Sequence, residues 1–468
     1  MNNYFRMPYF QEIDAFHAPT WVKQTVWYQI FPERFANGDP TNDPQDTKAW
    51  NPRIHPGRQD FYGGDLQGVL DHLDYLVELG VNGIYFNPLF LAPSNHKYDT
   101  QDYFQIDPHF GDAKLFKKLV QTAHQKGIKI MLDAVFNHIG DQSLQWQDVI
   151  QKGATSPYAD WFHIRKFPVS YTTTDNFEFS QDVNYDTFAF TPHMPKLNTA
   201  NPAVQDYLLK IAKYWVQEFD IDAWRLDVAN EVDHHFWRRF HQEMLALKPD
   251  FYILGEIWHT SQAWLNGDEL TGVMNYPYTG AIIDHFIKAQ LTAPKLLAKL
   301  TSHLMKYRDS ANQMMFNVLD SHDTARLLTL AKEDKTLALQ TLAFTFLQPG
   351  VPSIYYGTEY AMTGANDPDC RKPMNWQPNE SEQNFYQNVQ NLVNLRRKHW
   401  QILSESAIIF QIQADLIVVK RECHGQSLTG IFNTTKQVQS VPTTTPILLQ
   451  AGYQKNKLAP KGFIILVD

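Results

Sequence analysis

Short apolar runs recur along most of the chain, and longer segments with helical spacing separate several of them. A run of four to eight apolar residues between polar segments is typical of a buried strand. Eight such runs predict eight strands, at residues 26–31, 83–86, 128–135, 221–228, 252–255, 272–275, 315–319 and 351–356.

Amphipathic segments fill several of the gaps between these runs. In residues 203–218 the apolar side chains recur at helical spacing, at Val204, Leu208, Ile211, Ala212 and Trp215. Residues 112–126 and 337–347 show a similar pattern. Strands that alternate with helices predict a parallel sheet, and eight of them predict an α/β fold with a closed (β/α)₈ TIM barrel.

Two parts of the chain depart from this alternation. Residues 139–198, after the third predicted strand, are rich in Trp, Tyr, Phe, Asp and Thr and show little period. Long structureless loops are uncommon in compact domains, so we expect an inserted subdomain over the barrel. Short strand-like runs from about residue 402 predict a C-terminal antiparallel β-sandwich. The expected domains are a barrel over 21–398, interrupted by the insertion, and the sandwich over 399–468.

Composition narrows the possible partners and compartment. The chain has 468 residues and a net charge of −9, so no basic surface favours nucleic acid. Two cysteines, Cys370 and Cys423, are too few for a disulfide framework, which favours free thiols in the cytoplasm. We expect neither a signal peptide nor a membrane span, because no apolar run has the required length or setting.

Reactive side chains follow four of the predicted strands. They are Asp133 and His138 after the third strand, Arg225 and Asp227 after the fourth, Glu256 after the fifth, and His322 and Asp323 after the seventh. Active sites of such barrels lie at the carboxyl ends of the strands, so these side chains are predicted to share one pocket. Arg225 and Asp227 are two apart and face the same way in a strand, so the guanidinium is expected to hold Asp227 ionised.

These four segments resemble, in the same order, the signature regions of the α-amylase superfamily, glycoside hydrolase family 13. Segments 94–99, 194–198, 228–231 and 367–373 are similar to motifs of its neopullulanase, cyclomaltodextrinase and maltogenic amylase group. The resemblance extends over nearly the whole chain from about residue 21. It implies hydrolysis of α-1,4 bonds in maltodextrins, cyclodextrins, pullulan or starch, with α-1,6 or transfer activity as a further expectation.

The resemblance also implies a role for each site residue. Asp227 would be the nucleophile, Glu256 the general acid/base and Asp323 the carboxylate that binds sugar hydroxyls and helps to distort the ring. Such retaining glycosidases need one ionised and one protonated carboxyl group. Residues implied to bind substrate are His96, Tyr98, His138, Arg225, His322, Lys196, Asn230, Glu231, Trp258, Asp369 and Arg371.

Structural interpretations remain open for several of these residues. Asp133 fits a hydrogen-bonding role within the strand ends. Asn230 and Glu231 fit a helix N-terminal cap as well as an acceptor subsite. Trp258 fits a core position and a platform for the acceptor sugar equally well.

A loop rich in oxygen donors predicts a structural calcium site. Carboxylate, amide and carbonyl oxygens suit Ca²⁺, although Asn, Asp, Gly and Pro also gather in ordinary turns. In the neopullulanase-like group a loop of this form binds calcium together with a following Gly-Gly-Asp. The residues implied here are Asn37, Asp39, Asn42, Asp43, Gly63 and Asp65.

The chain also differs from the group it resembles. Members usually carry an N-terminal β-sandwich that contributes to a dimer, and residues 1–20 look like only the linker that follows it. We therefore expect a monomer or an atypical dimer. Two alternatives remain: an oligo-1,6-glucosidase or other exo-α-glucosidase of the same superfamily, and an inactive sugar-binding homologue.

Overall fold

Eight parallel strands form one closed sheet in the computed structural model, which describes residues 19–174 and 180–467. Their neighbour order is β10-β9-β8-β5-β2-β1-β12-β11, and a parallel bridge from Met274 to Phe316 joins the two ends. The strands are β1 (Trp27–Ile30), β2 (Gly83–Phe86), β5 (Lys129–Ala134), β8 (Ala223–Leu226), β9 (Tyr252–Gly255), β10 (Gly272–Val273), β11 (Phe316–Asn317) and β12 (Val351–Tyr355). The predicted barrel is confirmed, and each predicted run contains one of its strands.

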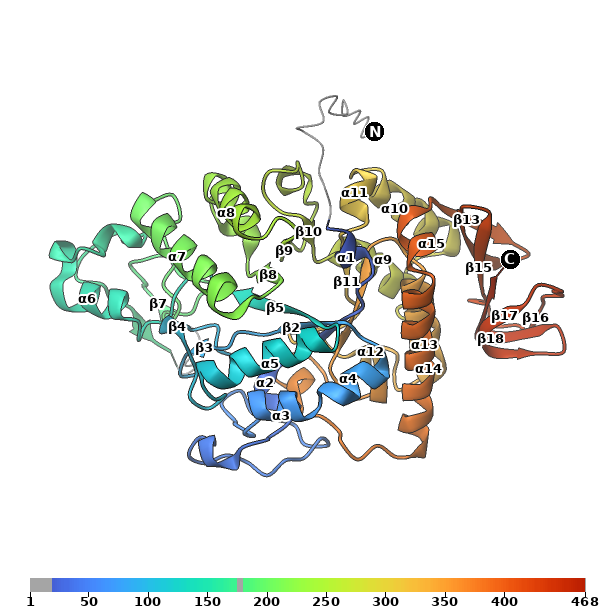
Figure 1. The fold of residues 1–468 in the computed structure, drawn as a ribbon, viewed down its shortest axis with the longest axis horizontal. Coiled ribbons are helices and arrows are strands. Elements are labelled where there is room, and N and C mark those ends of the chain that lie inside the picture. Colours follow the sequence, from blue (N-terminus) through green and yellow to red (C-terminus); the bar gives the residue numbers. More distant parts are fainter. Residues whose placement is uncertain (1–18, 175–179, 468) are drawn as a thin grey trace.

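Helices surround the barrel and connect its strands (Figure 1). The longer ones are α5 (Ala113–Gln125), α7 (Pro202–Phe219), α8 (His234–Leu247), α9 (Tyr276–Phe286), α10 (Ala293–Leu304), α13 (Lys335–Phe346) and α14 (Glu380–Lys398). Shorter ones are α1 (Thr20–Lys23), α2 (Pro32–Phe35), α3 (Leu66–Asp71), α4 (Leu73–Leu79), α11 (Asp309–Asn312), α12 (Leu327–Leu330) and α15 (Trp400–Glu405). Their local sequence favours these ends: α7 begins at Pro202, and the Asn201 side chain accepts a hydrogen bond from the Ala203 N–H.

Large side chains fill the interior of the barrel. Trp27 of β1 stacks on Tyr252 of β9, with ring centroids 6.1 Å apart, and Phe316 lies against Trp27. Met131 and Met274 belong to the same buried cluster. A barrel packed in this way is a rigid support for the side chains at its carboxyl end.

The predicted insertion is a small unit built on the chain between β5 and α7. It contains α6 (Leu144–Lys152), the 3₁₀ turn η4 (Ala159–Trp161) and the short pair β6 (Thr172–Thr173) and β7 (Ser180–Gln181). Trp146 is its centre, with ring centroids 4.7 Å from Phe162 and 4.6 Å from Tyr185. An antiparallel bridge between His138 and Lys196 holds the start and end of the insertion together.

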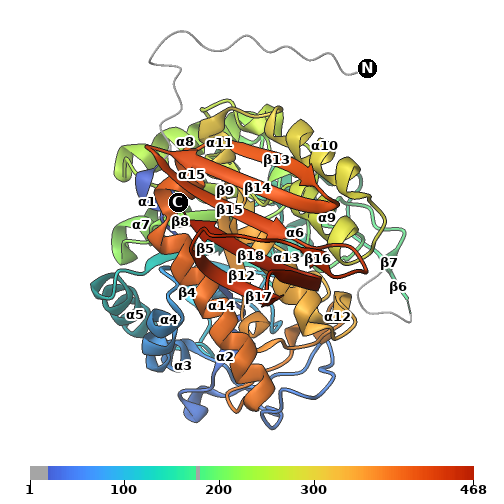
Figure 2. The ribbon, with the colours of Figure 1, turned by 90° about the vertical axis from the view of Figure 1, so that its right-hand side faces the viewer.

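Antiparallel strands form the C-terminal unit, at the opposite end of the molecule from α6 (Figures 1 and 2). They are β13 (Ile408–Gln413), β14 (Leu416–Cys423), β15 (Gln426–Phe432), β16 (Gln439–Ser440), β17 (Ile447–Gln454) and β18 (Lys457–Val467). Hydrogen bonds connect these six into a single sheet, where the sequence predicted a sandwich. Alternate residues of β18 face opposite sides: Phe463 and Ile465 join the barrel core, whereas Ile464 and Leu466 join a separate outer cluster.

Several predictions about the whole chain can be compared with the fold. Both cysteines are free, as expected. Within residues 19–174 and 180–467, none of the helices has the length and apolar character that a membrane crossing requires. The predicted linker at residues 1–20 lies outside the described residues except for Pro19 and Thr20.

Candidate active site

Strand register brings Asp133 and Arg225 together at the carboxyl end of the barrel. Asp133 of β5 pairs directly with Arg225 of β8. Nη1 of Arg225 lies 2.8 Å and 2.9 Å from the two carboxylate oxygens of Asp133, and both side chains are fully buried. Asp133 therefore anchors the guanidinium, in agreement with its structural interpretation.

The same guanidinium contacts both proposed catalytic carboxyl groups. Nη1 of Arg225 lies 2.9 Å from Oδ1 of Asp227, and Nη2 makes an ion-pair contact of 2.8 Å with Oε2 of Glu256. Asp227 follows β8 and Glu256 follows β9, so the parallel pairing of these strands sets them side by side. One arginine thus positions three carboxyl groups from three neighbouring strands.

Burial and neighbouring charges both act on the pKa of Asp227. Burial is the largest cause that raises the pKa of Asp227 well above its ordinary value. Charges on Glu256, Asp133 and Asp323 raise that pKa further, whereas Arg225 lowers it. Arg225 thus acts on Asp227 in the predicted direction, toward the ionised form, and burial and the neighbouring carboxyl groups oppose it. Strongly interacting carboxyl groups titrate together, so the raised pKa is a property of the cluster and not of Asp227 alone.

Two N–H groups hold the carboxyl group of Glu256 from opposite sides. The Val228 N–H donates to Oε2 at 3.2 Å, and the Trp258 indole N–H donates to Oε1 at 3.1 Å. Val228 has a φ of 46°, a left-handed conformation that is strained for a β-branched residue. Because it directly follows the proposed nucleophile, this strained residue links Asp227 to Glu256.

Trp258 lies at the surface of the site. Its ring stacks on Tyr276, with centroids 3.7 Å apart and an interplanar angle of 5°, yet 49% of the residue is exposed. The interpretation of Trp258 as a core residue is therefore wrong. An exposed ring beside the general acid/base fits the other interpretation, a platform for the acceptor sugar.

A chain of hydrogen bonds fixes the Tyr98 ring. The Tyr98 hydroxyl donates to Oδ2 of Asp133 at 2.8 Å and lies 2.8 Å from Nε2 of His322. Gln29 Nε2 donates to Nδ1 of His322 at 2.8 Å, so the proton of the neutral ring is on Nε2. Burial, with the Arg371 charge, lowers the pKa of His322 well below its usual value. His322 is thus a neutral hydrogen-bond donor.

His138 and His96 are also neutral. Burial lowers the pKa of His138 to about 3, and its ring stacks on Phe188 of the insertion with centroids 4.8 Å apart. Burial lowers the pKa of His96 to about 4, and its Nδ1 accepts a hydrogen bond from the Tyr98 N–H at 3.1 Å. A neutral imidazole can donate and accept at once, which suits binding of sugar hydroxyls.

Asp323 completes the set of acidic side chains. Its Oδ2 lies 3.1 Å from Nε2 of His322, and its Oδ1 lies 3.3 Å from Nη2 of Arg371. Burial and the charge of Glu256 raise the pKa of Asp323 to about 7. The structure therefore brings Asp227, Glu256 and Asp323 to one place, as the sequence predicted.

The segment that carries Arg371 presents a different acid from the one predicted. Nη1 of Arg371 pairs with Oδ1 of Asp367 at 2.9 Å. Asp369 instead accepts a hydrogen bond from the Ala365 N–H and lies 2.5 Å from Nδ1 of His55. Asp367, which the sequence interpretation passed over, is thus the acid that accompanies Arg371 beside Asp323.

Residues predicted for the acceptor side form a second group. Nζ of Lys196 lies 2.5 Å from Oδ1 of Asn137 and 2.7 Å from Oε2 of Glu231. Asn230 and Glu231 belong to the 3₁₀ turn η5 (Ala229–Glu231), and Glu231 is exposed. The capping interpretation is wrong, because the side chain that caps α8 is Asp233.

Three contributing residues were missed by sequence reasoning. The Tyr85 hydroxyl donates to Oδ2 of Asp133 at 2.6 Å, Gln29 orients His322, and Asp367 pairs with Arg371. Gln29 offered a usable signal, since it is a polar residue in a buried apolar run. Asp367 begins the segment 367–373 that resembles a family motif, whereas Tyr85 carried no such signal.

The predicted calcium loop gathers oxygen atoms that have no partner. Oδ1 of Asn37 and Oδ1 of Asn42 are buried without a hydrogen bond among the described residues. Nδ2 of Asn37 donates to Oδ1 of Asp43 at 2.8 Å, next to Gly63. A Cβ added to Gly63 would lie 2.2 Å from that carboxylate oxygen. Buried amide oxygens without donors are what a bound cation would satisfy.

The two other predicted ligands, Asp39 and Asp65, have protein partners. Asp65 caps α3 and also accepts hydrogen bonds from the Gly38 and Asp39 N–H groups, at 3.1 Å and 2.8 Å. Oδ1 of Asp39 accepts from Thr41. Across residues 19–174 and 180–467, no three His, Cys, Asp or Glu side chains gather as a metal cluster. A cation here would depend on amide and backbone oxygens.

Comparison with known proteins places this site in a family. Residues 29–422 match the family model described as Alpha amylase, catalytic domain. The intracellular maltogenic amylase of Bacillus subtilis is 52% identical over 441 residues, 94% of this chain and 73% of that protein. The cyclomaltodextrinase of Geobacillus thermopakistaniensis is 50% identical over 467 residues, 98% of this chain and 77% of that protein.

A solved structure matches with the same architecture. It is the cyclic α-maltosyl-(1→6)-maltose hydrolase from Arthrobacter globiformis in complex with that sugar, with a TM-score of 0.87 and 34% identity. The match covers 96% of this chain and 100% of the other. With the family model, the two relatives and the carboxyl cluster in agreement, the chain belongs to the α-amylase family and is a glycoside hydrolase.

Proposed function

We propose that the chain hydrolyses α-1,4-glucosidic bonds of maltodextrins, cyclodextrins or pullulan and retains the α configuration. The observation that carries this proposal is the contact of one Arg225 guanidinium with both Asp227 and Glu256. Two carboxyl groups held by one guanidinium are neighbours, as the two catalytic carboxyl groups of a retaining glycosidase must be. The names of the relatives, maltogenic amylase and cyclomaltodextrinase, support the sugar class.

Chemistry at this site needs one proton on the cluster. Asp227 attacks the anomeric carbon while Glu256 gives its proton to the glycosidic oxygen. The bond between the anomeric carbon and the glycosidic oxygen breaks in this step. Glu256 then takes a proton from a water molecule, which attacks the same carbon and releases Asp227. The neutral rings of His322 and His138 direct their Nε2–H groups to the hydroxyl and the carbonyl oxygen of Tyr98 and so position that residue, whereas Asp323 accepts hydrogen bonds from hydroxyls of the sugar at the cleaved bond.

Replacement of the proposed acid tests this mechanism. Glu256→Gln keeps the shape of the side chain but removes the transferable proton, so kcat should fall by about 10²–10⁴. Glu243→Gln, a change at a half-buried glutamate on α8, should leave kcat unchanged. Equal activity of Glu256→Gln and the wild type would refute the assignment. NMR of fresh product should show the α anomer first, and the β anomer first would refute retention.

Product analysis on pullulan separates the proposed activity from its alternative. Panose as the product supports hydrolysis of internal α-1,4 bonds. Glucose as the only early product would instead support an exo-α-glucosidase, and no turnover of any α-glucan would support an inactive homologue. We also propose a cytoplasmic location, supported by the relative named intracellular and by the two free thiols.

We propose in addition that the loop around Asn37 binds a structural Ca²⁺ ion. The partnerless oxygens of Asn37 and Asn42 and the adjacent carboxylate of Asp43 support this assignment. The ion would hold the loop against the start of α3 and would take no part in bond cleavage. A chelator should lower the melting temperature of the wild type but not that of Asn37→Ala. An equal effect on both, with no calcium in the purified protein, would refute the site.

A further inference from the structure

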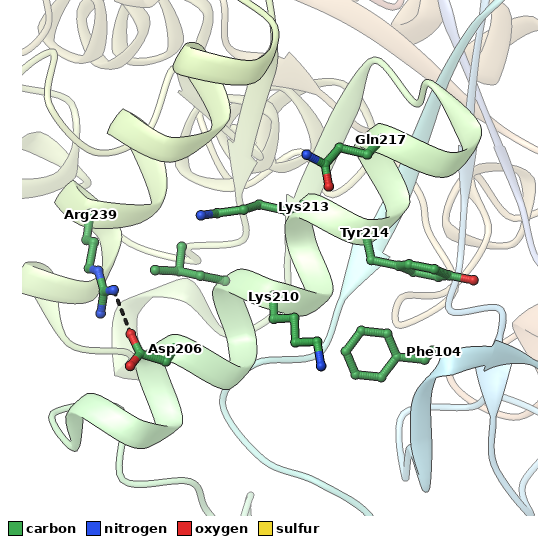
Figure 3. Close-up of a pocket in the computed structure, with 8 residues that line it drawn as sticks. Phe104, Asp206, Lys210, Lys213, Tyr214, Gln217 and Arg239 are labelled. Atoms are coloured by element: carbon green, nitrogen blue, oxygen red, sulfur yellow. Dashed lines mark hydrogen bonds and ion pairs between the residues drawn. The ribbon is translucent and has the colours of Figure 1, made fainter.

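A hollow of about 430 Å³ lies on the outer side of α7 (Figure 3). It lies between β4 (Asp102–Ile106), α7 and α8, and contains none of the predicted active-site residues. The side chains that line it are Phe104, Asp206, Leu209, Lys210, Lys213, Tyr214, Gln217 and Arg239. Phe104, Leu209 and Tyr214 give this surface its apolar part, and the other five side chains are polar or charged.

A row of partly exposed aromatic rings connects this hollow with the inserted subdomain. It consists of Tyr158, Trp161, Tyr207, Phe104 and Tyr214, each half-buried. Successive ring centroids are 5.0, 5.2, 6.1 and 5.4 Å apart, and the planes of neighbouring rings are inclined by 84°, 47°, 69° and 71°. Tyr207 and Tyr214 are seven residues apart on α7, so two helical turns place them on the same face.

Charges around the hollow are mostly paired. Arg239 lies 2.6 Å from Asp206, and Lys213 lies 2.7 Å from Glu243. Nζ of Lys210 lies 5.5 Å from the centre of the Phe104 ring. The pairing leaves little net charge for an anionic ligand. Lysine and arginine each carry several N–H donors, and the paired carboxylate uses only some of them. The remaining N–H groups can donate to sugar hydroxyls.

We propose that this hollow and the aromatic row bind a second stretch of α-glucan chain, outside the active site. The apolar faces of the sugar rings would pack on Tyr214, Phe104 and Tyr207, and the hydroxyls would accept from Lys210 and Arg239. Because the row begins in the insertion that borders the active site, a long chain held here would be concentrated near the cleavage site. The inference rests on the proposed function for its ligand class.

Binding stoichiometry tests the second site directly. In the Glu256→Gln background, calorimetric titration with maltoheptaose should reveal two sites. Adding Tyr214→Ala and Lys210→Ala should abolish the second site or weaken it about tenfold. Adding Glu218→Ala instead, on the same helix but outside the hollow, should change neither the number of sites nor the affinity of the second site. One site in the Glu256→Gln parent, or two unchanged sites in the triple variant, would overturn the proposal and leave the row as ordinary packing.

Kinetics of the otherwise wild-type enzyme separate this proposal from the proposed function. Tyr214→Ala with Lys210→Ala should raise the KM for soluble starch severalfold and leave kcat/KM for maltotriose unchanged. Normal turnover of maltotriose with an unchanged KM for starch would refute the second site alone. Absence of maltotriose turnover in the wild type would refute the proposed function instead.

Discussion

Lys97 is a buried cation that should control the shape of the substrate-binding turn. It lies between His96 and Tyr98 and has a φ of 64°, in the left-handed region. Its Nζ contacts Oδ2 of Asp107 at 2.7 Å and the Ala92 carbonyl oxygen at 2.9 Å. Only 1% of the Lys97 side chain and 2% of the Asp107 side chain are exposed. This buried ion pair opposes the cost of the left-handed turn, about 1–2 kcal/mol.

Lys97→Met retains most of the stem and removes the ammonium group. Breaking one side of a buried ion pair costs about 3–5 kcal/mol. Asp107 keeps hydrogen bonds from the Ala92 N–H at 3.1 Å and the His109 N–H at 3.0 Å, so we expect the lower end, about 3 kcal/mol. A looser turn would also misplace Tyr98, and kcat/KM should fall by about 10- to 100-fold.

Urea unfolding and kcat/KM for maltotriose measure the two effects. Lys97→Met with Asp107→Asn removes both charges and should recover part of the lost stability, since no carboxylate stays unpaired. Lys114→Met, at an exposed lysine of α5, is the control and should match the wild type. The reasoning is refuted if Lys97→Met unfolds at the wild-type urea concentration, or if the double variant is no more stable than the single one.

Three further changes test other parts of the structure. Gly63→Ala should lower the free energy of unfolding by more than the roughly 1 kcal/mol of left-handed backbone strain, because the added Cβ would also meet Asp43. Gly425 has a φ of 77° and open space around it, so Gly425→Ala should show the backbone strain alone. Arg421→Met should cost about 2–4 kcal/mol in urea unfolding and spare kcat, since its buried guanidinium donates to the carbonyl oxygens of Leu347, directly after α13, and of Leu403 in α15. Folding lowers the pKa of His138 from 6.5 to about 3. The neutral ring therefore contributes fully to the free energy of unfolding above pH 6.5, and this contribution declines as the pH falls toward 3. Relative to His138→Asn, the wild type should lose stability across that window by up to about 1.4 kcal/mol per pH unit, and parallel pH curves would contradict this.

The barrel was predictable because its signals are local. Each of the eight strands lies within an apolar run, even where β10 and β11 contain only two residues each. The strand ends then identified Asp227, Glu256 and Asp323, since a parallel barrel brings all carboxyl ends to one face. Whether the C-terminal strands form one sheet or two facing sheets was less predictable, because both arrangements give the same alternation of side chains along each strand.

Side-chain partners were harder to predict because they depend on distant segments. Asp367 and Asp369 are two residues apart and chemically identical, but Arg371 pairs with the first and His55 contacts the second. Tyr85 belongs to an apolar run and still donates a hydrogen bond to Asp133. No local pattern distinguishes these cases, since each contact joins residues from different strands or loops.

The pKa of Asp227 depends on carboxyl groups from other strands, which the local sequence does not reveal. Within its own strand, Asp227 has one charged neighbour, Arg225, and that pair alone would favour the ionised form. In the folded barrel the pairing of β5, β8 and β9 adds Asp133 and Glu256 to the same guanidinium, and the segment after β11 adds Asp323. Two guanidinium groups, those of Arg225 and of Arg371 beside Asp323, face these four carboxyl groups, and burial with the surplus of negative charge raises the pKa of Asp227 despite Arg225. A retaining hydrolase needs one proton among its carboxyl groups, on the residue that protonates the leaving oxygen, and crowding of acids favours such a state.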